Sequence, residues 1–178
     1  VSQKGIDLIP DGTRALVASG RLRLAILGTG EQQLERAMRD LAAEFPGRVT
    51  ARIEYDGELA RLIMSGSDAL RMPSRYEPCG LSQMYAQRHA SLPVARRTGG
   101  LADSIDDGIT GFLFNESNVS SYRQAVQRAL AIHQHPQLLA AMRCRAMGAG
   151  FFWRHAIEPY DALYRQLLGE RREVRLLI

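Results

Sequence analysis

The chain has 178 residues, of which 46% are hydrophobic and 24% are charged. That is enough for one packed core and too little for two substantial domains, so we expect a single domain over residues 1–178. The composition excludes a disordered chain, and no apolar run reaches the roughly 18 to 20 residues that a membrane-spanning helix needs. Because the opening VSQKGIDLIP lacks the layout of a secretory signal, we expect a cytoplasmic protein with no membrane partner.

Charge and cysteine content narrow the range of partners. The chain has 23 Lys and Arg against 19 Asp and Glu, a net charge of +4. These basic residues are scattered among acidic neighbours, as in EQQLERAMRDLAAEF, without the stripe that favours a nucleic-acid backbone. Cys79 and Cys144 fit neither a disulfide framework nor a CxxC metal site. We therefore expect no nucleic acid and no metal, and the positive balance suits a small anionic ligand.

The first two thirds of the chain alternate between strand and helix patterns. An apolar run at 22–28 ends in glycine and predicts a strand, after which Leu34, Met38 and Leu41 recur at helical spacing. Further strands are expected at 49–55, 67–74, 92–98 and 111–114, separated by helices at about 58–64, 80–90 and 101–107. Strands and helices in alternation predict an α/β fold with a doubly wound parallel sheet and ligands at the carboxyl ends of the strands.

Both ends of the chain depart from this alternation. The chain opens on a helix-like stretch, although such a sheet ordinarily begins with a central strand, so we expect the first strand to be missing. Residues 119–168 have a helical pattern throughout and should pack as outer helices. Within them, Trp153, Tyr160 and Tyr164 stand at helical spacing, which predicts packing residues.

The strongest chemical signal is the run PSRYEPCGLSQMYA at 73–86, where Glu77 and a turn containing glycine separate a strand from a helix. The amides of Gly80, Leu81 and Ser82 should start that helix unpaired and so offer an anion site. Glu77 would repel an anion, so its plausible task is to accept hydrogen bonds from hydroxyl groups nearby. A sugar phosphate meets both demands.

A second loop follows the next strand and carries Thr98, Gly99 and Gly100. Paired glycines let the backbone approach a ligand closely and point its amides inward. Because the two loops follow successive strands, we expect them to face one shared site. The Gly28-Thr29-Gly30 turn, by contrast, has Gln33 in the third glycine position of a dinucleotide fingerprint, which disfavours a nicotinamide cofactor.

Together these runs carry a family resemblance. PSRYEPCGLSQMYA, followed by LPVARRTGGLADS and TGFLF, closely resembles the C-terminal domain of bacterial glycogen synthases and plant starch synthases, and the resemblance extends over residues 2–168. It implies a nucleotide-sugar-binding domain that is Rossmann-like and forms one half of a GT-B fold. The implied activity is transfer of glucose from ADP-glucose to the non-reducing end of an α-1,4-glucan, with retention of configuration and without a cofactor.

The resemblance also implies roles for particular residues. Lys4 would neutralise the diphosphate and Glu77 would hold the glucose hydroxyls, which makes these two the candidate catalytic residues. Tyr55 would pack on the adenine ring, although by itself it suits a half-buried strand tyrosine, and Cys79 by itself suits a small buried thiol. The remaining candidate donor-binding residues belong to the two loops: Cys79, Gly80, Leu81, Ser82, Thr98, Gly99 and Gly100.

Several positions depart from the family pattern. Glu54 replaces a glycine beside Tyr55, Arg71 lies in an apolar strand, Gln87 takes an apolar helix position, and Ala90 stands where glycine ends a helix. We also expect Pro10 to interrupt the first helix, since a proline beyond the first turn removes a backbone donor.

In the family, an N-terminal domain absent from this chain holds the acceptor glucan, so we expect the chain alone to be inactive. Two alternatives stay open. One is a decayed module that no longer binds a nucleotide sugar productively, and the other is a related GT-B transferase with another donor. Binding of ADP-glucose tests the first alternative, and its comparison with UDP-glucose tests the second.

Overall fold

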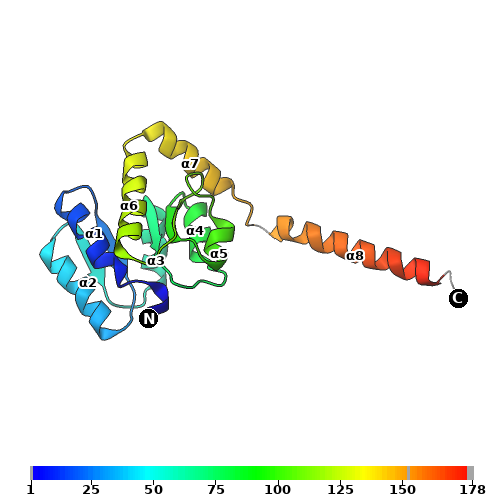
Figure 1. Ribbon diagram of the computed structural model, residues 1–178, viewed down its shortest axis with the longest axis horizontal. Helices are drawn as coiled ribbons and strands as arrows, with labels where there is room; N and C mark the ends of the chain where they lie inside the picture. The colour runs from blue at the N-terminus through cyan, green and yellow to red at the C-terminus, as the bar shows by residue number, and fades with distance from the viewer. Residues whose placement is uncertain (1, 152, 176–178) are drawn as a thin grey trace. The chain divides into compact units, whose positions relative to one another are not determined.

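The computed structural model describes residues 2–151 and 153–175, which form two compact units, one ending at Gly148 and the other beginning at Ala149. The first unit holds all the strands named here, and the second holds one long helix (Figure 1). In chain order the elements are a 3-10 helix Ser2–Lys4, α1 Leu8–Ala18, β1 Leu24–Leu27, α2 Gln32–Glu44, β2 Val49–Arg52, α3 Gly57–Gly66, β3 Ala69–Met72, α4 Ser82–Arg88, β4 Leu92–Arg96, α5 Gly99–Ser104, β5 Phe112–Phe114, α6 Val119–His133, α7 Pro136–Gly148 and α8 Trp153–Arg175.

The strands pair in parallel, as the alternating pattern predicts. β1 pairs with β2, and β3, β4 and β5 form a second sheet in that order. In this second sheet Val94 of β4 lies between Arg71 of β3 and Phe112 of β5, and the strand β4 is buried except at its last residue. The predicted α/β class is confirmed.

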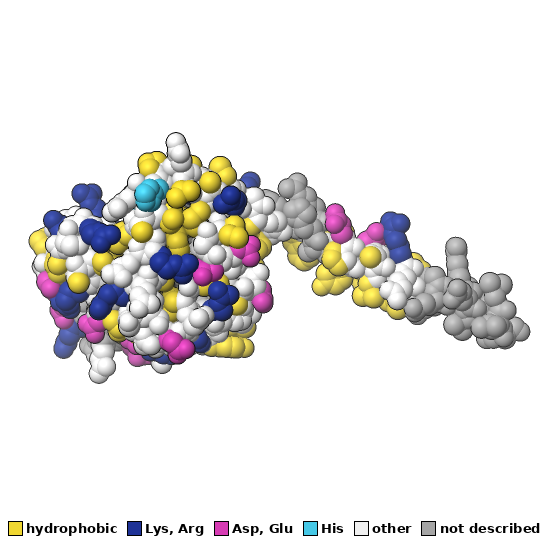
Figure 2. All heavy atoms as spheres, turned by 45° about the horizontal axis from the view of Figure 1, so that its top comes forward, with side chains coloured by type: hydrophobic (Ala, Val, Ile, Leu, Met, Phe, Trp, Pro, Cys, Tyr) yellow, Lys and Arg dark blue, Asp and Glu magenta, His cyan; other side chains and the backbone are white. Residues whose placement is uncertain are grey.

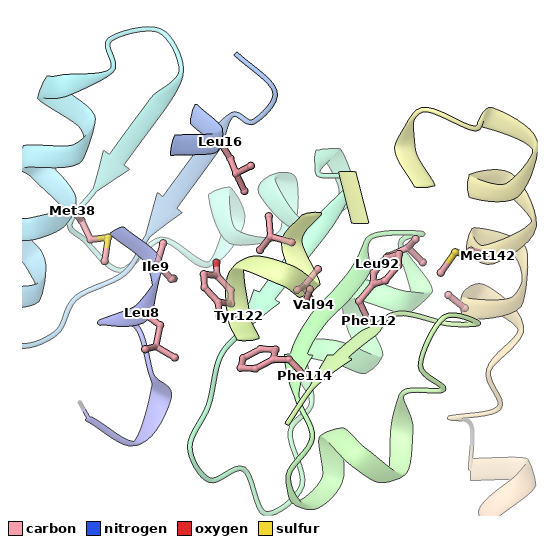
Figure 3. Packing of buried hydrophobic residues seen from close by; sticks show 13 residues of the cluster. Leu8, Ile9, Leu16, Met38, Leu92, Val94, Phe112, Phe114, Tyr122 and Met142 are labelled. Carbon is pink, nitrogen blue, oxygen red and sulfur yellow. The ribbon is translucent and has the colours of Figure 1, made fainter. Parts of the chain in front are cut away.

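The main core lies where α1 and α6 cover β4 and β5. Leu8 and Ile9 of α1 point toward Tyr122 of α6, which meets Phe114 of β5 edge to face at 5.7 Å between ring centroids (Figure 3). Tyr122 is fully buried, and this burial raises the pKa of its phenol. Since α1 contributes to this core, the segment before β1 is anchored to the domain.

The helix pattern read from Leu34, Met38 and Leu41 is confirmed in α2. Met38 and Leu41 are buried, and Leu41 packs with Val17, Leu24 and Val49 in a second cluster. A third cluster under α5 contains Ala95, Leu101, Ile105 and Leu113. These clusters hold the strands whose carboxyl ends carry the predicted loops.

Pro10 does not interrupt the first helix, so that expectation is wrong. The helix α1 begins at Leu8, which places Pro10 in its first turn. Backbone N–H groups of the first turn have no acceptor inside the helix, so the missing donor of proline costs nothing there.

Trp153, Tyr160 and Tyr164 all lie on α8, so the helical spacing read from them is confirmed. Hydrophobic side chains are visible along this helix in Figure 2. Helical spacing does not name the surface that covers a helix face, so the role of these residues in packing stays a prediction.

Ala90, which follows α4, has a φ of +61°, a left-handed conformation that strains any residue with a Cβ. This agrees with the expectation that glycine suits the position. We expect Ala90→Gly to raise the free energy of unfolding by about 0.5–1 kcal/mol, because relief of strain exceeds the added chain entropy. Chemical denaturation measures the change.

The control is the same substitution at Ala43, an exposed residue inside α2, which should lower stability by about 1 kcal/mol. A loss of stability in Ala90→Gly of the same size as in Ala43→Gly would contradict the backbone conformation of Ala90.

Candidate active site

Glu77 lies in the loop between β3 and α4 and is buried. Its Oε2 atom accepts a hydrogen bond from Lys4 Nζ at 2.5 Å and another from Ser74 Oγ at 3.3 Å. The two candidate catalytic residues, 73 positions apart in sequence, therefore form an ion pair. Lys4 is the only lysine among the 23 Lys and Arg residues of the chain, and its side chain is half exposed.

The two predicted loops are in direct contact. The amide of Gly100 donates to the carbonyl of Glu77 at 3.1 Å. A Cβ on Gly100 would overlap the carbonyl oxygen of Cys79 and lie 2.5 Å from its carbonyl carbon, and one on Gly99, where φ is +42°, would overlap the carbonyl oxygen of Glu77. Only glycines allow this approach, so the expectation that the loops lie together is confirmed.

The loop contact uses one of the amides that the sequence assigned to a ligand. Because the Gly100 amide donates within the protein, its role there is to join the loops, and a role in donor binding stays a prediction. The amides of Gly80, Leu81 and Ser82 have no acceptor among the residues that the structure describes, as expected. The helix α4 itself begins at Ser82.

One side chain in the loop differs in exposure from what the sequence suggested. Cys79 is exposed, so its interpretation as a buried thiol, which was inferred from residue type alone, is wrong. Leu81 in the same turn is 58% exposed. Thr98 is half-buried and precedes α5. The donor-binding roles of these residues remain predictions.

Two supporting residues were not identified from the sequence. The fully buried Gln83 donates from Nε2 to the carbonyls of Cys79 and Gly80 and to Ser104 Oγ at 2.9–3.1 Å. Arg96 at the end of β4 donates to the carbonyls of Ser74 and Arg75. The sequence offered one signal for them, since both are polar residues beside apolar elements. Together they hold the backbone around Glu77 in place.

Tyr55 follows the two-stranded sheet, whereas Glu77 follows the three-stranded one. It is 93% exposed and lies beyond the end of β2, so its interpretation as a half-buried strand tyrosine is wrong. Glu54 forms an ion pair with Arg52, at 2.7 Å between Oε1 and Nε. Contact of Tyr55 with adenine stays a prediction.

The other departures from the family pattern are accommodated differently. Gln87 is fully buried and donates from Nε2 to the carbonyl of Ser104 at 2.9 Å, which gives the polar group a partner. Arg71 is half-buried, and its Nη1 atom has no hydrogen-bond partner within the described part of the chain.

Asp7 and Arg75 form a bidentate ion pair beside the site, with oxygen–nitrogen distances of 2.7 and 2.6 Å. The hydrogen bond from Arg75 lowers the pKa of Asp7 below its ordinary value. A lowered folded-state pKa adds stability above the unfolded pKa, and that stability is lost as pH falls through the folded value.

We expect Asp7→Asn to cost about 0.5–1 kcal/mol at pH 7, a small effect because both side chains are partly exposed. The difference from the unmodified protein should shrink as pH falls through the acid range in which Asp7 becomes protonated. Urea unfolding at a series of pH values measures this, with Asp40→Asn on the exposed face of α2 as control. A difference independent of pH would refute the ion pair as its source.

Two surface hollows of about 260 Å³ each lie beside α6 and do not include Glu77. Among the described residues, no three His, Cys, Asp or Glu side chains are grouped to hold a metal ion. No helix in the described ranges is long and apolar enough to cross a membrane. On the face shown in Figure 2, basic and acidic side chains are interspersed, and no basic stripe is visible there.

The fold and the site define an α/β protein whose candidate ligand-binding groups follow the carboxyl ends of parallel strands. The chain belongs to the family "Glycosyl transferases group 1", whose family model matches residues 1–131. This agrees with the class of enzyme that its motifs predict.

Individual relatives indicate the type of glycosyltransferase more specifically than the family model does. The chain is 61% identical to a glycogen synthase of Pseudomonas syringae pv. syringae over 98% of its residues, and 56% identical to one of Pseudomonas fluorescens over 96%. It also resembles the catalytic domain of starch synthase IV from Arabidopsis thaliana, bound to ADP and acarbose, at 28% identity with a TM-score of 0.80 over 93% of this chain. The predicted resemblance to glycogen and starch synthases is confirmed, and the chain matches one part of the GT-B fold, as predicted.

The chain spans only part of these proteins. It covers 36% and 35% of the two glycogen synthases and 36% of the starch synthase chain. Its similarity therefore concerns about a third of each relative.

Proposed function

We propose that this chain is the donor-binding part of a glycogen synthase, which transfers glucose from ADP-glucose to the non-reducing end of an α-1,4-glucan with retention of configuration. The high identity to glycogen synthases supports this assignment. The ADP bound to the starch synthase IV catalytic domain supports an adenine nucleotide as part of the donor. The acceptor glucan would be held by a further domain of the whole protein.

The ion pair between Lys4 and Glu77, in contact with the glycine loop, is the observation that carries the proposal. A diphosphate entering this site competes with Glu77 for the Lys4 ammonium. Once Lys4 turns to the phosphates, the Glu77 carboxylate is free to accept hydrogen bonds from sugar hydroxyls. Lys4 would then bind the diphosphate of a nucleotide sugar, and Glu77 would bind its sugar.

This arrangement fits the charges of glycosyl transfer. Breaking the bond between sugar and diphosphate builds negative charge on the leaving group, which Lys4 and the free amides of Leu81 and Ser82 would stabilise. The loops at 73–82 and 96–100 contain no carboxylate besides Glu77. A covalent intermediate on a second carboxylate therefore has no candidate there, and we favour attack by the acceptor hydroxyl on the face that the diphosphate leaves.

Isothermal titration calorimetry with the 178-residue chain tests the donor assignment. We expect binding of ADP-glucose, weaker binding of ADP, and the weakest binding of UDP-glucose. Tighter binding of UDP-glucose than of ADP-glucose would point instead to a related transferase with another donor. A folded protein that binds none of the three would be a decayed module.

The transfer reaction itself requires the whole protein. Incubation of that protein with labelled ADP-glucose and a maltooligosaccharide should lengthen the acceptor by α-1,4-linked glucose, detected by chromatography. A cytoplasmic location and the absence of a metal or other cofactor remain predictions, and activity undiminished by EDTA would support the latter.

A further inference from the structure

The segment that carries Lys4 is held to the Glu77 loop by a cluster of polar contacts. Arg75, two residues before Glu77, forms the bidentate ion pair with Asp7 and also donates from Nη1 to the carbonyl of Ser2 at 2.6 Å. Ser2 and Asp7 lie on either side of Lys4 in sequence. We call Arg75 with these two partners the N-terminal latch.

Further contacts bring the same two segments together without the Arg75 side chain. The amide of Arg75 donates to the carbonyl of Gln3 at 2.8 Å, and Gln3 Nε2 donates to the carbonyl of Tyr76 at 3.2 Å. Gly5 has a φ of +62°, and a Cβ there would lie 2.8 Å from the carbonyl carbon of Pro73. The backbone of the Lys4 segment thus passes directly against the Glu77 loop.

The 3-10 helix Ser2–Lys4 has only three residues and cannot hold its conformation alone. Its position depends on what lies at its two sides. A single planar guanidinium that binds a carbonyl before Lys4 and a carboxylate after it restricts both ends of the segment at once. A long lysine side chain, by contrast, loses much rotational freedom when it is fixed at one carboxylate.

We propose that Arg75 is a positioning residue, which through the N-terminal latch fixes Lys4 at the distance from Glu77 that donor binding requires. This inference rests on the proposed function and adds to it the residue that sets the geometry of the pair. Arg75 itself needs no contact with the donor. Its effect on donor binding passes through Lys4.

The first test needs no ligand, because Lys4 is the only lysine in the chain. Acetylation by N-succinimidyl acetate, followed by mass spectrometry of the peptide containing Lys4, reports how often its amine leaves Glu77. We expect Arg75→Gln and Asp7→Asn each to increase the rate about fivefold, in line with loss of one partly exposed ion pair. Unchanged rates in both variants would overturn the proposal.

Arg143→Gln is the matched control. Arg143 pairs with Asp68 at 2.5 Å, and its side chain is 31% exposed against 34% for Arg75, but neither partner belongs to the site. We expect this control to leave the acetylation rate of Lys4 unchanged. An increase equal to that of Arg75→Gln would mean that general loosening of the fold exposes Lys4, which would also overturn the proposal.

The second test measures ADP-glucose binding in a double-mutant cycle of Arg75→Gln and Lys4→Met. We expect Arg75→Gln to weaken binding about fivefold when Lys4 is present and to have no effect when it is absent. Equal weakening in both backgrounds would show that Arg75 acts without Lys4. If the unmodified chain binds no ADP-glucose, the proposed function fails, whereas the acetylation rates still decide whether the latch positions Lys4.

Discussion

Glu77→Gln is expected to weaken binding of ADP-glucose by about tenfold to a hundredfold, because hydrogen bonds to a charged acceptor contribute roughly 1.5–3 kcal/mol each. Binding of ADP should not weaken, since ADP lacks the hexose that Glu77 would hold. It should become somewhat tighter, because Lys4 loses its competing partner. Calorimetry with both ligands measures this divergence.

Lys4→Met provides the complementary variant. It should weaken binding of ADP and of ADP-glucose to a similar degree, since both carry the diphosphate. Glu44→Gln is the control, because Glu44 also pairs with a basic residue, Arg14, but on an exposed surface away from the site. If Glu77→Gln reduced the affinities for ADP and ADP-glucose equally, Glu77 would support the loop and not the sugar.

Gly100→Ala is expected to have the largest effect on stability, a loss of about 3 kcal/mol or more. The added Cβ would meet the backbone of Cys79, and neither segment can yield by rotating a side chain. Relief requires the two loops to separate, which also breaks the hydrogen bond from the Gly100 amide to Glu77. Denaturant unfolding gives the stability, and we expect loss of ADP-glucose binding in parallel.

The matched control is Gly66→Ala at the end of α3, where an added Cβ meets no atom within 4 Å. This change should alter stability by no more than about 0.5–1 kcal/mol, and in the stabilising direction. A Gly100→Ala protein as stable as the unmodified one would be incompatible with the contact between the loops.

The order of elements and the place of the candidate site in the fold were accessible from the sequence. Alternating apolar periods identify the strands from β1 to β5, and glycines after β3 and β4 identify the two loops that follow them. These are local signals, since a period or a turn residue acts within a few positions. The resemblance of the same runs to glycogen and starch synthases is confirmed by the relatives.

Other features depend on where the first helix starts or on what covers a surface. The prediction for Pro10 was wrong because the cost of a proline depends on its distance from the first residue of the helix. The helix α1 begins only at Leu8, so Pro10 lies in its first turn. Amphipathic spacing places Trp153 on a helix but does not say what packs on its apolar face, so the packing of Trp153 stays a prediction. Both cases depend on structural context and not on residue chemistry.

Local pattern thus sufficed for the α/β class, the strand ends and the candidate carboxylate, because each follows from residue type and spacing over short range. Three contacts were visible only in the tertiary structure. They are the ion pair of Lys4 with Glu77, the hydrogen bond of the Gly100 amide between the loops, and the ion pair of Arg75 with Asp7. These contacts link polar residues that are far apart in the chain and follow no period, so they depend on how the backbone of one segment passes another.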